Sequence, residues 1–381
     1  MLRSRRNIVL FLMAIFVLPA AAADQSAGDF HWKKHTINAD SHFEAAGIGD
    51  MNNDAKKDIV SGEYWYEAPA WKPHKIAELE PIDTYYNDFA DEIQDVDGDG
   101  DLDIVCVTYF SKEVFWRENP GAKDAIWATH TIDTPGNMET GFLFDVNGDG
   151  LEDVFPDLAQ EVVWYEKRPA KEGAPYFTKR FASKNGGGHG HGVGDVNGDG
   201  VTDIVAPGGW LEGKKNGAEM AWTWRPEFQL GTASFPILVK DVDGDGLNDI
   251  VWGLGHDYGL YWLQQGKKDG ERTWTKHLID KSWSQPHYIW IGDLKGDGSW
   301  QLVTGKRYYA HNGHDPGAND PRCIYVYTFD PKKDEWKRHV VEENGNAGFG
   351  LNPAIGDIDG DGDIDLVCPG KSGLYLFEQV K

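Results

Sequence analysis

Short apolar runs alternate with polar turns along this 381-residue chain, and the runs recur in a fixed order. A short run ends in an acidic turn, a run such as Asp-Ile-Val follows the turn, an aromatic-rich run comes next, and a run opening with Trp-x-x-His comes last. β-Branched and aromatic residues favour extended strands, so each repeat predicts four strands. The apolar positions two residues before the turns are Ile48, Ile93, Leu143, Val193, Val239, Ile291 and Ile355.

The acidic turns mark the repeat, and the clearest copy, residues 95–103, reads DVDGDGDLD. The copies begin at Asp50, Asp95, Asp145, Asp195, Asp241, Asp293 and Asp357. Their spacing of about 50 residues is typical of propeller blades. Seven repeats of four strands predict an all-β, seven-bladed β-propeller. The strand before each turn is expected to be innermost, and residues 31–37 are expected to complete the last blade and so remove an exposed edge.

Oxygen-bearing side chains occupy positions 1, 3, 5 and 9 of most turns, with glycine at positions 4 and 6. A hard cation such as Ca²⁺ requires oxygen ligands around a tight turn. An EF-hand loop begins in the same way, but it needs Glu at position 12 and helices on both sides. Position 12 is Ser61, Cys106, Pro156, Ala206, Trp252, Thr304 or Cys368. We therefore expect structural calcium between the first and second strands of the blades.

Five turns carry the full set of expected calcium ligands. They are Asp95, Asp97, Asp99 and Asp103; Asp145, Asn147, Asp149 and Asp153; Asp195, Asn197, Asp199 and Asp203; Asp241, Asp243, Asp245 and Asp249; and Asp357, Asp359, Asp361 and Asp365. The first turn offers Asp50, Asn52, Asp54 and Asp58. It also has Ala55 and Lys56 at turn positions, so weaker binding is expected there. In the sixth turn Lys295 and Gln301 replace two ligands, and the Lys295 ammonium is expected beside Asp293 and Asp297 instead of calcium.

With these turns the chain resembles the FG-GAP or VCBS repeat propellers, whose best-known type is the head of the integrin alpha chain. The resemblance covers roughly residues 30–381. It implies the propeller fold and calcium, whereas an activity has to be argued from the site.

The N-terminal residues 1–23 combine three arginines, an apolar run and an Ala-rich end, which predicts a signal peptide cleaved near Ala23. A membrane anchor is the alternative, but the run is short for a span. We expect residues 24–381 to be one propeller domain, exported to the periplasm or the extracellular space. The formal charge of −25 argues against a nucleic-acid partner.

Twelve of the thirteen histidines fall into two groups. Those of the Trp-x-x-His runs recur with the repeat and predict packing on an outer strand: His35, His74, His130, His277 and His339. The others break the pattern and are expected to converge on the face opposite the acidic turns: His42, His189, His191, His256, His287, His311 and His314. A role that every blade needs recurs, whereas a specific site does not, so the second group is the candidate for function.

Equal registers of the innermost strands come to equal heights around a propeller axis. Six residues before each turn stand Glu44, Phe89, Glu139, His189, Phe235, His287 and Leu351. This level predicts a second metal site for Zn, Mn or Fe. Its expected ligands are His189, His191, His287, Glu44 and Glu139. A hydrated polar channel is the alternative reading of the same residues.

Two longer segments, 206–222 and 304–323, are expected to be insertions on this face. The second is polar and not repetitive, as binding loops are. His311 suits a general base, Lys306 or Arg307 could stabilise negative charge, and a tyrosine could stack on a sugar. The predicted catalytic residues are His311, His191, Lys306, Arg307 and Tyr309. The predicted substrate-binding residues are His42, Tyr86, His256, Tyr258, Tyr308 and His314.

The Gly-His-Gly-His-Gly run before Asp195 and the Lys-Arg-Tyr-Tyr-Ala-His-Asn-Gly run resemble the propeller part of aldos-2-ulose dehydratase-type proteins. This second resemblance implies metal-assisted β-elimination from a ketosugar, with a histidine removing the proton next to the carbonyl. Some propeller polysaccharide lyases use His and Tyr similarly. The sequence therefore predicts a carbohydrate-binding lyase or dehydratase acting on a ketosugar or uronate. The alternative is a noncatalytic module that binds a carbohydrate or a protein.

Overall fold

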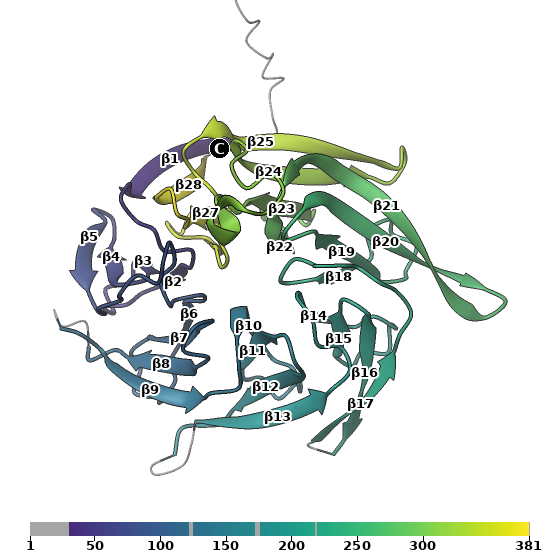
Figure 1. Cartoon of the computed structure of the whole chain (residues 1–381), viewed down its shortest axis with the longest axis horizontal. Helices are drawn as coiled ribbons and strands as arrows, with labels where there is room; N and C mark the ends of the chain where they lie inside the picture. The colour runs from purple at the N-terminus through teal and green to yellow at the C-terminus, as the bar shows by residue number, and fades with distance from the viewer. Residues whose placement is uncertain (1–29, 122–124, 172–175, 218, 381) are drawn as a thin grey trace, which may run out of the picture.

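The structure is a computed structural model that describes residues 30–121, 125–171, 176–217 and 219–380. The predicted signal segment, residues 1–23, lies outside this part of the chain. Within it, strands β1–β28 form seven four-stranded antiparallel sheets that surround a central axis (Figure 1). The prediction of an all-β, seven-bladed propeller is confirmed. Among the described residues no helix is long and apolar enough to cross a membrane.

Each blade is a meander whose strands run outward from the axis. Blade 1 is β2 (Gly47–Gly49), β3 (Asp58–Ser61), β4 (Tyr64–Glu67) and β5 (Lys72–Lys75), and blade 2 is β6 (Glu92–Gln94), β7 (Asp103–Val107), β8 (Val114–Glu118) and β9 (Ala128–Asp133). Blade 3 is β10 (Met138–Phe144), β11 (Asp153–Leu158), β12 (Val162–Lys167) and β13 (Phe177–Ser183), and blade 4 is β14 (Gly192–Gly194), β15 (Asp203–Ala206), β16 (Gly209–Asn216) and β17 (Glu219–Arg225). Blade 5 is β18 (Leu238–Lys240), β19 (Asp249–Gly253), β20 (Tyr258–Lys268) and β21 (Glu271–Ser284). Blade 6 is β22 (Pro286–Gly292), β23 (Gln301–Lys306), β24 (Arg322–Asp330) and β25 (Glu335–Gly345), and blade 7 is β26 (Ala354–Gly356), β27 (Asp365–Cys368), β28 (Leu374–Val380) and β1 (His31–Asn38).

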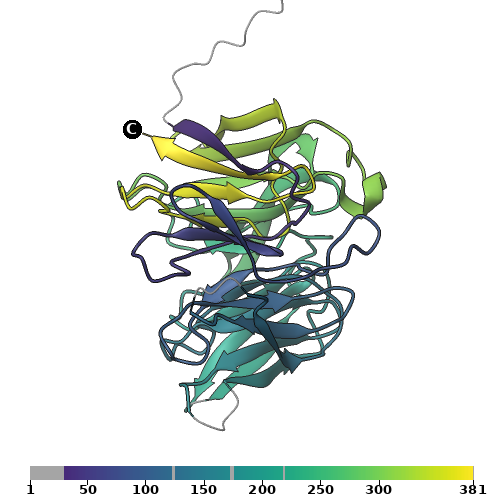
Figure 2. The same ribbon diagram turned by 90° about the vertical axis from the view of Figure 1, so that its left-hand side faces the viewer.

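The first strand closes the ring. β1 pairs antiparallel with β28, with His31 opposite Val380 and Thr36 opposite Tyr375. The two strands lie side by side in both views, β1 in purple and β28 in yellow (Figures 1 and 2). Strands from the two ends of the chain thus share one blade, and the ladder covers an edge that β28 would otherwise expose.

Each acidic turn joins the first and second strands of its blade and is tied down by its ninth residue. In the second turn Asp103 accepts the Val96 N–H at 2.8 Å on Oδ2 and the Asn119 N–H at 2.8 Å on Oδ1. The same pair of backbone bonds holds the ninth aspartate of five further turns. In the sixth turn Gln301 Oε1 accepts the Leu294 N–H at 2.8 Å. In the six turns that have aspartate at position nine, this side chain therefore fixes the turn to the third strand or to the residue that follows it.

The repeated histidines pack or form hydrogen bonds on the outer strands, as predicted, and three of the five, His74, His130 and His277, stack on a tryptophan of the neighbouring strand. The ring centroids lie 4.2 Å apart for His74 and Trp65, and 4.5 Å apart for His130 and Trp116, with both pairs stacked. Stacking of this kind adds to the burial of the large indole ring. These histidines belong to the blade framework.

Two expectations are wrong. Residues 206–222 are not an insertion, because β16 and most of β17 occupy them as a regular pair of strands. Lys295 does not form the expected ion pair with Asp293 or Asp297 in the sixth turn, although its charge adds to the bonds from Ser299 that lower the pKa of Asp297. Its Nζ lies 4.5 Å from the centroid of the Phe30 ring, and it contacts Asp293 through its backbone N–H at 3.2 Å. The cation–π contact draws the flexible side chain away from the turn.

Candidate functional site

Four blades bring one carboxylate and three imidazoles together on the face opposite the acidic turns. Glu139 lies in β10, His189 precedes β14, His256 lies between β19 and β20, and His287 lies in β22. Glu139 Oε2 is 3.0 Å from His189 Nε2, 3.0 Å from His287 Nε2 and 3.6 Å from His256 Nε2. We call Glu139, His189, His256 and His287 the histidine–glutamate cluster.

Hydrogen bonds fix the tautomers of two of these rings. His189 Nδ1 donates to the Ala233 carbonyl at 2.7 Å, and His256 Nδ1 donates to Asp315 Oδ2 at 2.8 Å. Nε2 of each ring therefore points inward, and the two Nε2 atoms are 2.7 Å apart. Two nitrogens at this distance require a proton or a cation between them. Burial lowers the pKa of His189, but its bond to Glu139 outweighs this and raises the pKa to about 9, so the His189 ring holds that proton unless a metal takes its place.

The donor set fits a transition metal. One ligand atom from each residue of the cluster lies within 4.8 Å of the others. Imidazole nitrogen and carboxylate oxygen suit Zn, Mn and Fe. Bonds from Nδ1 to a carbonyl and a carboxylate are the outer contacts that orient metal-ligating histidines. The residues present therefore fit the second metal that the sequence predicts.

Arg307 supplies the positive charge that balances the carboxylates. Its buried guanidinium donates from Nε to Glu44 at 3.1 Å and from Nη1 to Glu139 at 3.4 Å. Burial alone would raise the pKa of Glu139, but the Arg307 charge and the bonds from the histidines outweigh it and hold that pKa well below its usual range. Burial and the same guanidinium charge lower the pKa of His287, so this imidazole is neutral.

The segment between β23 and β24 covers one side of the cluster. His311 stacks on His256 with centroids 4.5 Å apart, and its Nε2 is 3.6 Å from Glu139 Oε1. Asp315 accepts from His311 Nδ1 at 2.9 Å while its other oxygen holds His256. His311 and the adjoining Asn312 have left-handed φ values of 46° and 57°. Such strain costs about 1–3 kcal/mol per residue and persists where surrounding contacts fix it.

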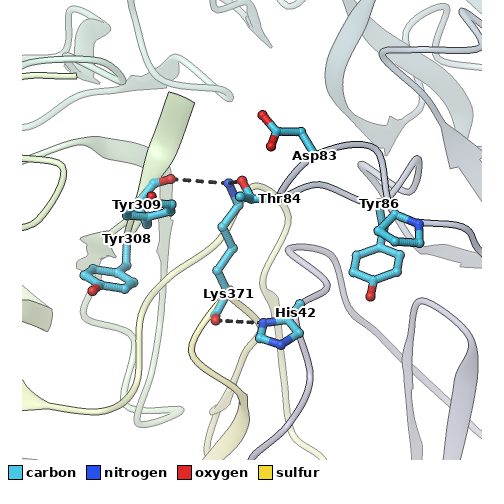
Figure 3. Close-up of a pocket in the computed structure, with 8 residues that line it drawn as sticks. His42, Asp83, Thr84, Tyr86, Tyr308, Tyr309 and Lys371 are labelled. Atoms are coloured by element: carbon cyan, nitrogen blue, oxygen red, sulfur yellow. Dashed lines mark hydrogen bonds between the residues drawn. The ribbon is translucent and has the colours of Figure 1, made fainter. Parts of the chain in front are cut away.

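A cavity of about 450–460 Å³ opens on each side of this segment. The first, which we call the cluster cavity, measures about 460 Å³ and is lined by Glu139, His189 and His256 of the cluster with His311 and Asp315, whereas His287 is buried behind this wall. Its remaining wall includes Tyr109, Asn137, Gln160 and Thr232. The second, which we call the tyrosine pocket, measures about 450 Å³ and is lined by His42, Asp83, Thr84, Tyr86, Tyr308, Tyr309 and Lys371 (Figure 3).

The predicted site residues are thus divided between two cavities. Glu139, His189 and His287 meet in the cluster with His256, which was expected to bind substrate. His42, Tyr86, Tyr308 and Tyr309 lie in the tyrosine pocket. Glu44 pairs with Arg307 one contact away from the cluster.

His191 is not placed where the sequence predicts. It is buried, with Nδ1 2.6 Å from Asp157 Oδ1 and Nε2 2.8 Å from the Gly186 carbonyl. The prediction assumed an extended strand through residues 189–191. Gly190 has φ +94° instead, which turns His191 away, and a Cβ there would lie 2.6 Å from the Ala233 carbonyl oxygen.

Three further predicted residues support the fold around the site. Lys306 is buried and donates to Ser284 Oγ at 2.7 Å and to the Gly317 carbonyl at 2.6 Å, so it faces neither cavity. Tyr258 donates to Asp320 at 2.5 Å in the same segment. His314 is exposed and ends the short 3-10 helix Ala310–Gly313. None of these three lines the two cavities described above.

Comparison with known proteins agrees with the class that the fold defines, a seven-bladed β-propeller. Residues 95–155 match the FG-GAP-like repeat, a stretch that spans the second and third acidic turns. No sequence match is found among curated proteins.

Solved structures resemble the chain at low sequence identity. One is an Agrocybe aegerita lectin that recognises non-reducing terminal N-acetylglucosamine, at 17% identity and a TM-score of 0.49, covering 92% of this chain and 86% of that one. The exotype rhamnogalacturonan lyase YesX has 12% identity and a TM-score of 0.45, with 91% and 72% covered. Rhamnogalacturonan lyase YesW has 12% identity and a TM-score of 0.45, with 90% and 75% covered. Likeness of this degree carries no argument about activity.

Proposed function

We propose that this propeller is a carbohydrate-active protein that holds a transition metal in the histidine–glutamate cluster and performs β-elimination on a ketosugar or uronate. The observation that carries the proposal is the meeting of three imidazole nitrogens and one carboxylate at the wall of a cavity of about 460 Å³, which Glu139, His189 and His256 line. Zn, Mn or Fe held there would supply a Lewis acid for a sugar oxygen. The other roles fall to side chains of the chain itself.

His311 is the proposed base. Asp315 accepts the hydrogen bond from Nδ1 of His311, so Nε2 is the basic atom, and it points toward the cluster. The imidazole is 45% exposed, so a substrate can reach it. His311 Nε2 removes the proton from the carbon next to the carbonyl, the electrons of that C–H bond form a C=C bond, and the β C–O bond breaks. The departing oxygen takes this proton back from the His311 imidazolium and leaves as water or an alcohol, so His311 ends the step as a neutral base.

Arg307 and Glu44 act as positioning residues in this proposal. The Arg307 guanidinium is buried between Glu44 and Glu139. There it keeps Glu139 ionised and fixes the position of the Glu139 carboxylate in the cluster. A buried charge pair of this kind is costly to break, because the remaining partner stays desolvated.

Tyr109 and polar side chains of the wall suit a sugar. Tyr109 is 38% exposed and packs edge-to-face on Phe110 with centroids 5.4 Å apart, which fixes its ring at the cavity. Aromatic rings offer a large apolar face with little conformational freedom. Asn137, Gln160 and Thr232 add donors and acceptors for hydroxyl groups. This combination of an apolar face and a few placed polar groups is typical of small-molecule sites.

Elemental analysis and product absorbance test the proposal. The wild type is expected to retain about one transition metal per chain, as a four-ligand site does, and His189→Ala and His287→Ala to lose it. His130→Ala, on the outer strand, is the matched control and should retain it. Ketosugars and uronate oligosaccharides are assayed by the ultraviolet absorbance of unsaturated products. If only calcium is found and no ketosugar or uronate oligosaccharide gives an unsaturated product, the chain is a noncatalytic binding module for a carbohydrate or a protein.

We also propose that the acidic turns hold structural calcium and that the chain is exported. Asp95, Asp97 and Asp99 each offer an oxygen within 4.8 Å of one another, and the corresponding residues of the fifth turn do the same. Oxygen-only ligands from a tight turn favour Ca²⁺ over the transition metals. The signal-like segment 1–23 supports export.

A further inference from the structure

The tyrosine pocket is separate from the cluster cavity, and the segment after β23 divides the two. Tyr308 and Tyr309 of this segment line the pocket, whereas His311 and Asp315 line the cluster cavity. The dividing segment is held in place, because Asn312 bonds to both Asp83 and Thr84 and because the His311 N–H donates to the Tyr85 hydroxyl at 2.6 Å. The pocket is therefore built into the fold.

Two tyrosine rings form opposite walls of this pocket, Tyr308 on one side and Tyr86 on the other (Figure 3). Each ring is packed against a neighbour. The Phe43 ring lies 4.7 Å from that of Tyr86, and the Arg322 guanidinium lies 4.6 Å from the centroid of Tyr308. Both walls are consequently oriented before a ligand arrives, which reduces the entropy lost on binding.

Polar groups lie between the two rings. Lys371 Nζ donates to Thr84 Oγ1 at 3.1 Å and to the Tyr309 carbonyl at 3.3 Å. His42 Nδ1 donates to the Lys371 carbonyl at 3.1 Å, which makes Nε2 of this exposed imidazole a hydrogen-bond acceptor. The Asp83 carboxylate adds a second acceptor. The pocket thus combines two apolar faces with donors and acceptors at their edges.

A pyranose ring has complementary chemistry, with C–H groups on its faces and hydroxyl groups around its edge. Charge decides between a neutral and an acidic sugar. The Lys371 ammonium is 3.9 Å from Glu44 and is balanced by it, Asp83 is a carboxylate, and the whole chain carries a formal charge of −25. A uronate would meet this negative potential without an unpaired cation to offset it.

We propose that the tyrosine pocket is a second carbohydrate-binding site, which holds one neutral pyranose unit between Tyr86 and Tyr308. This site does not depend on the metal or on the elimination reaction, since no residue of the histidine–glutamate cluster lines it. It would let the protein hold a glycan at one point while the cluster cavity acts at another.

Saturation-transfer NMR with the full-length protein tests the proposal, using methyl glycosides of glucose, galactose and mannose and, as acidic probes, glucuronate and galacturonate. We expect at least one neutral glycoside to bind, and Tyr86→Ala and Tyr308→Ala each to weaken it about tenfold, as loss of one stacking wall predicts. Tyr86→Phe should bind as the wild type does and shows that the pocket remains folded.

Two variants of the cluster cavity separate this site from the proposed active site. His189→Ala and Tyr109→Ala should leave neutral glycoside binding unchanged. The proposal is overturned if the wild type binds no neutral glycoside, if uronates alone bind, or if His189→Ala abolishes binding while Tyr86→Ala and Tyr308→Ala do not. Loss of elimination activity in His189→Ala with intact glycoside binding supports both sites independently.

Discussion

Replacing Asp315 with asparagine tests how the site is organised, because this carboxylate serves two histidines at once. Its oxygens accept from His256 Nδ1 at 2.8 Å and from His311 Nδ1 at 2.9 Å. In Asp315→Asn one amide oxygen still accepts, but the amide nitrogen is a donor and cannot accept the second Nδ1–H. One of the two rings must change tautomer or turn, so that its Nε2 no longer offers a lone pair inward.

The expected effect follows from the bond that is lost. A hydrogen bond to a charged group contributes about 1.5–3 kcal/mol to stability, which corresponds to roughly 10- to 150-fold in an equilibrium constant. Mutation of the groups that orient metal-ligating histidines lowers metal affinity by a similar factor of about 10–100-fold. The Asp315 side chain is 14% exposed, so water replaces part of the lost interaction. We therefore expect metal affinity to fall about tenfold if the His256 bond is lost, and kcat to fall if the His311 bond is lost.

Metal affinity is measured by competition with a chelating indicator, and kcat by product absorbance with saturating metal. Asp320→Asn is the matched control, because Asp320 lies in the same segment and accepts from the Tyr258 hydroxyl, not from a histidine. His311→Ala should lower kcat and keep the metal. If Asp315→Asn leaves both metal affinity and kcat within twofold of the wild type, the carboxylate does not orient either ring and the reasoning fails.

Three shorter predictions concern stability and packing. Chelation of calcium should lower the calorimetric Tm, which is measured in the His189→Ala background so that loss of the transition metal does not contribute. A calcium site contributes about 2.7 kcal/mol when free calcium is a hundredfold above its Kd. An unchanged Tm would count against calcium in the turns. Burial lowers the pKa of Lys306 to about 8 from 10.5. Between pH 8 and 10.5 the unfolded chain therefore still holds the Lys306 proton that the folded chain has lost, so denaturant titrations should show the stability of the wild type rising relative to Lys306→Met by up to ~3 kcal/mol. A stability difference that does not change with pH would refute the pKa shift. A Cβ at Gly255 would lie 3.1 Å from His287 Cδ2 and 3.3 Å from His189 Cε1, and so would crowd both rings. Gly255→Ala should therefore weaken metal retention during dialysis several-fold with little change in Tm. Unaltered metal retention would contradict this reasoning.

The repeat explains what the sequence could predict. Blade number and the place of the innermost strands follow from the acidic turns, and equal register is enough to bring Glu139, His189 and His287 to one level. His256 lies in the connection between β19 and β20, outside the innermost strands that the register count covers, so counting could not assign it to the cluster. His191 was misplaced because a single left-handed glycine breaks the alternation of an extended strand. The register argument holds where the strand is regular and fails where the backbone turns.

The tyrosine pocket shows a second limit of the same kind. Tyr86 and Tyr308 were both expected to bind substrate, but whether two loops share one cavity depends on what stands between them. Here the segment after β23 is anchored to the connection between β5 and β6 and separates the two spaces. This packing depends on contacts between side chains that are far apart in the sequence, so a local sequence pattern cannot predict it.

The site also depends on closure of the ring. The histidine–glutamate cluster takes its residues from blades 3, 4, 5 and 6, and Arg307 of blade 6 joins it to Glu44, which precedes β2 of blade 1. Distances of about 3 Å between side chains on different blades are fixed only when every blade packs on two neighbours. The β1–β28 pairing completes blade 7, whose innermost strand β26 packs on β2 of blade 1. Weakening that ladder should therefore loosen the cluster before the rest of the propeller unfolds.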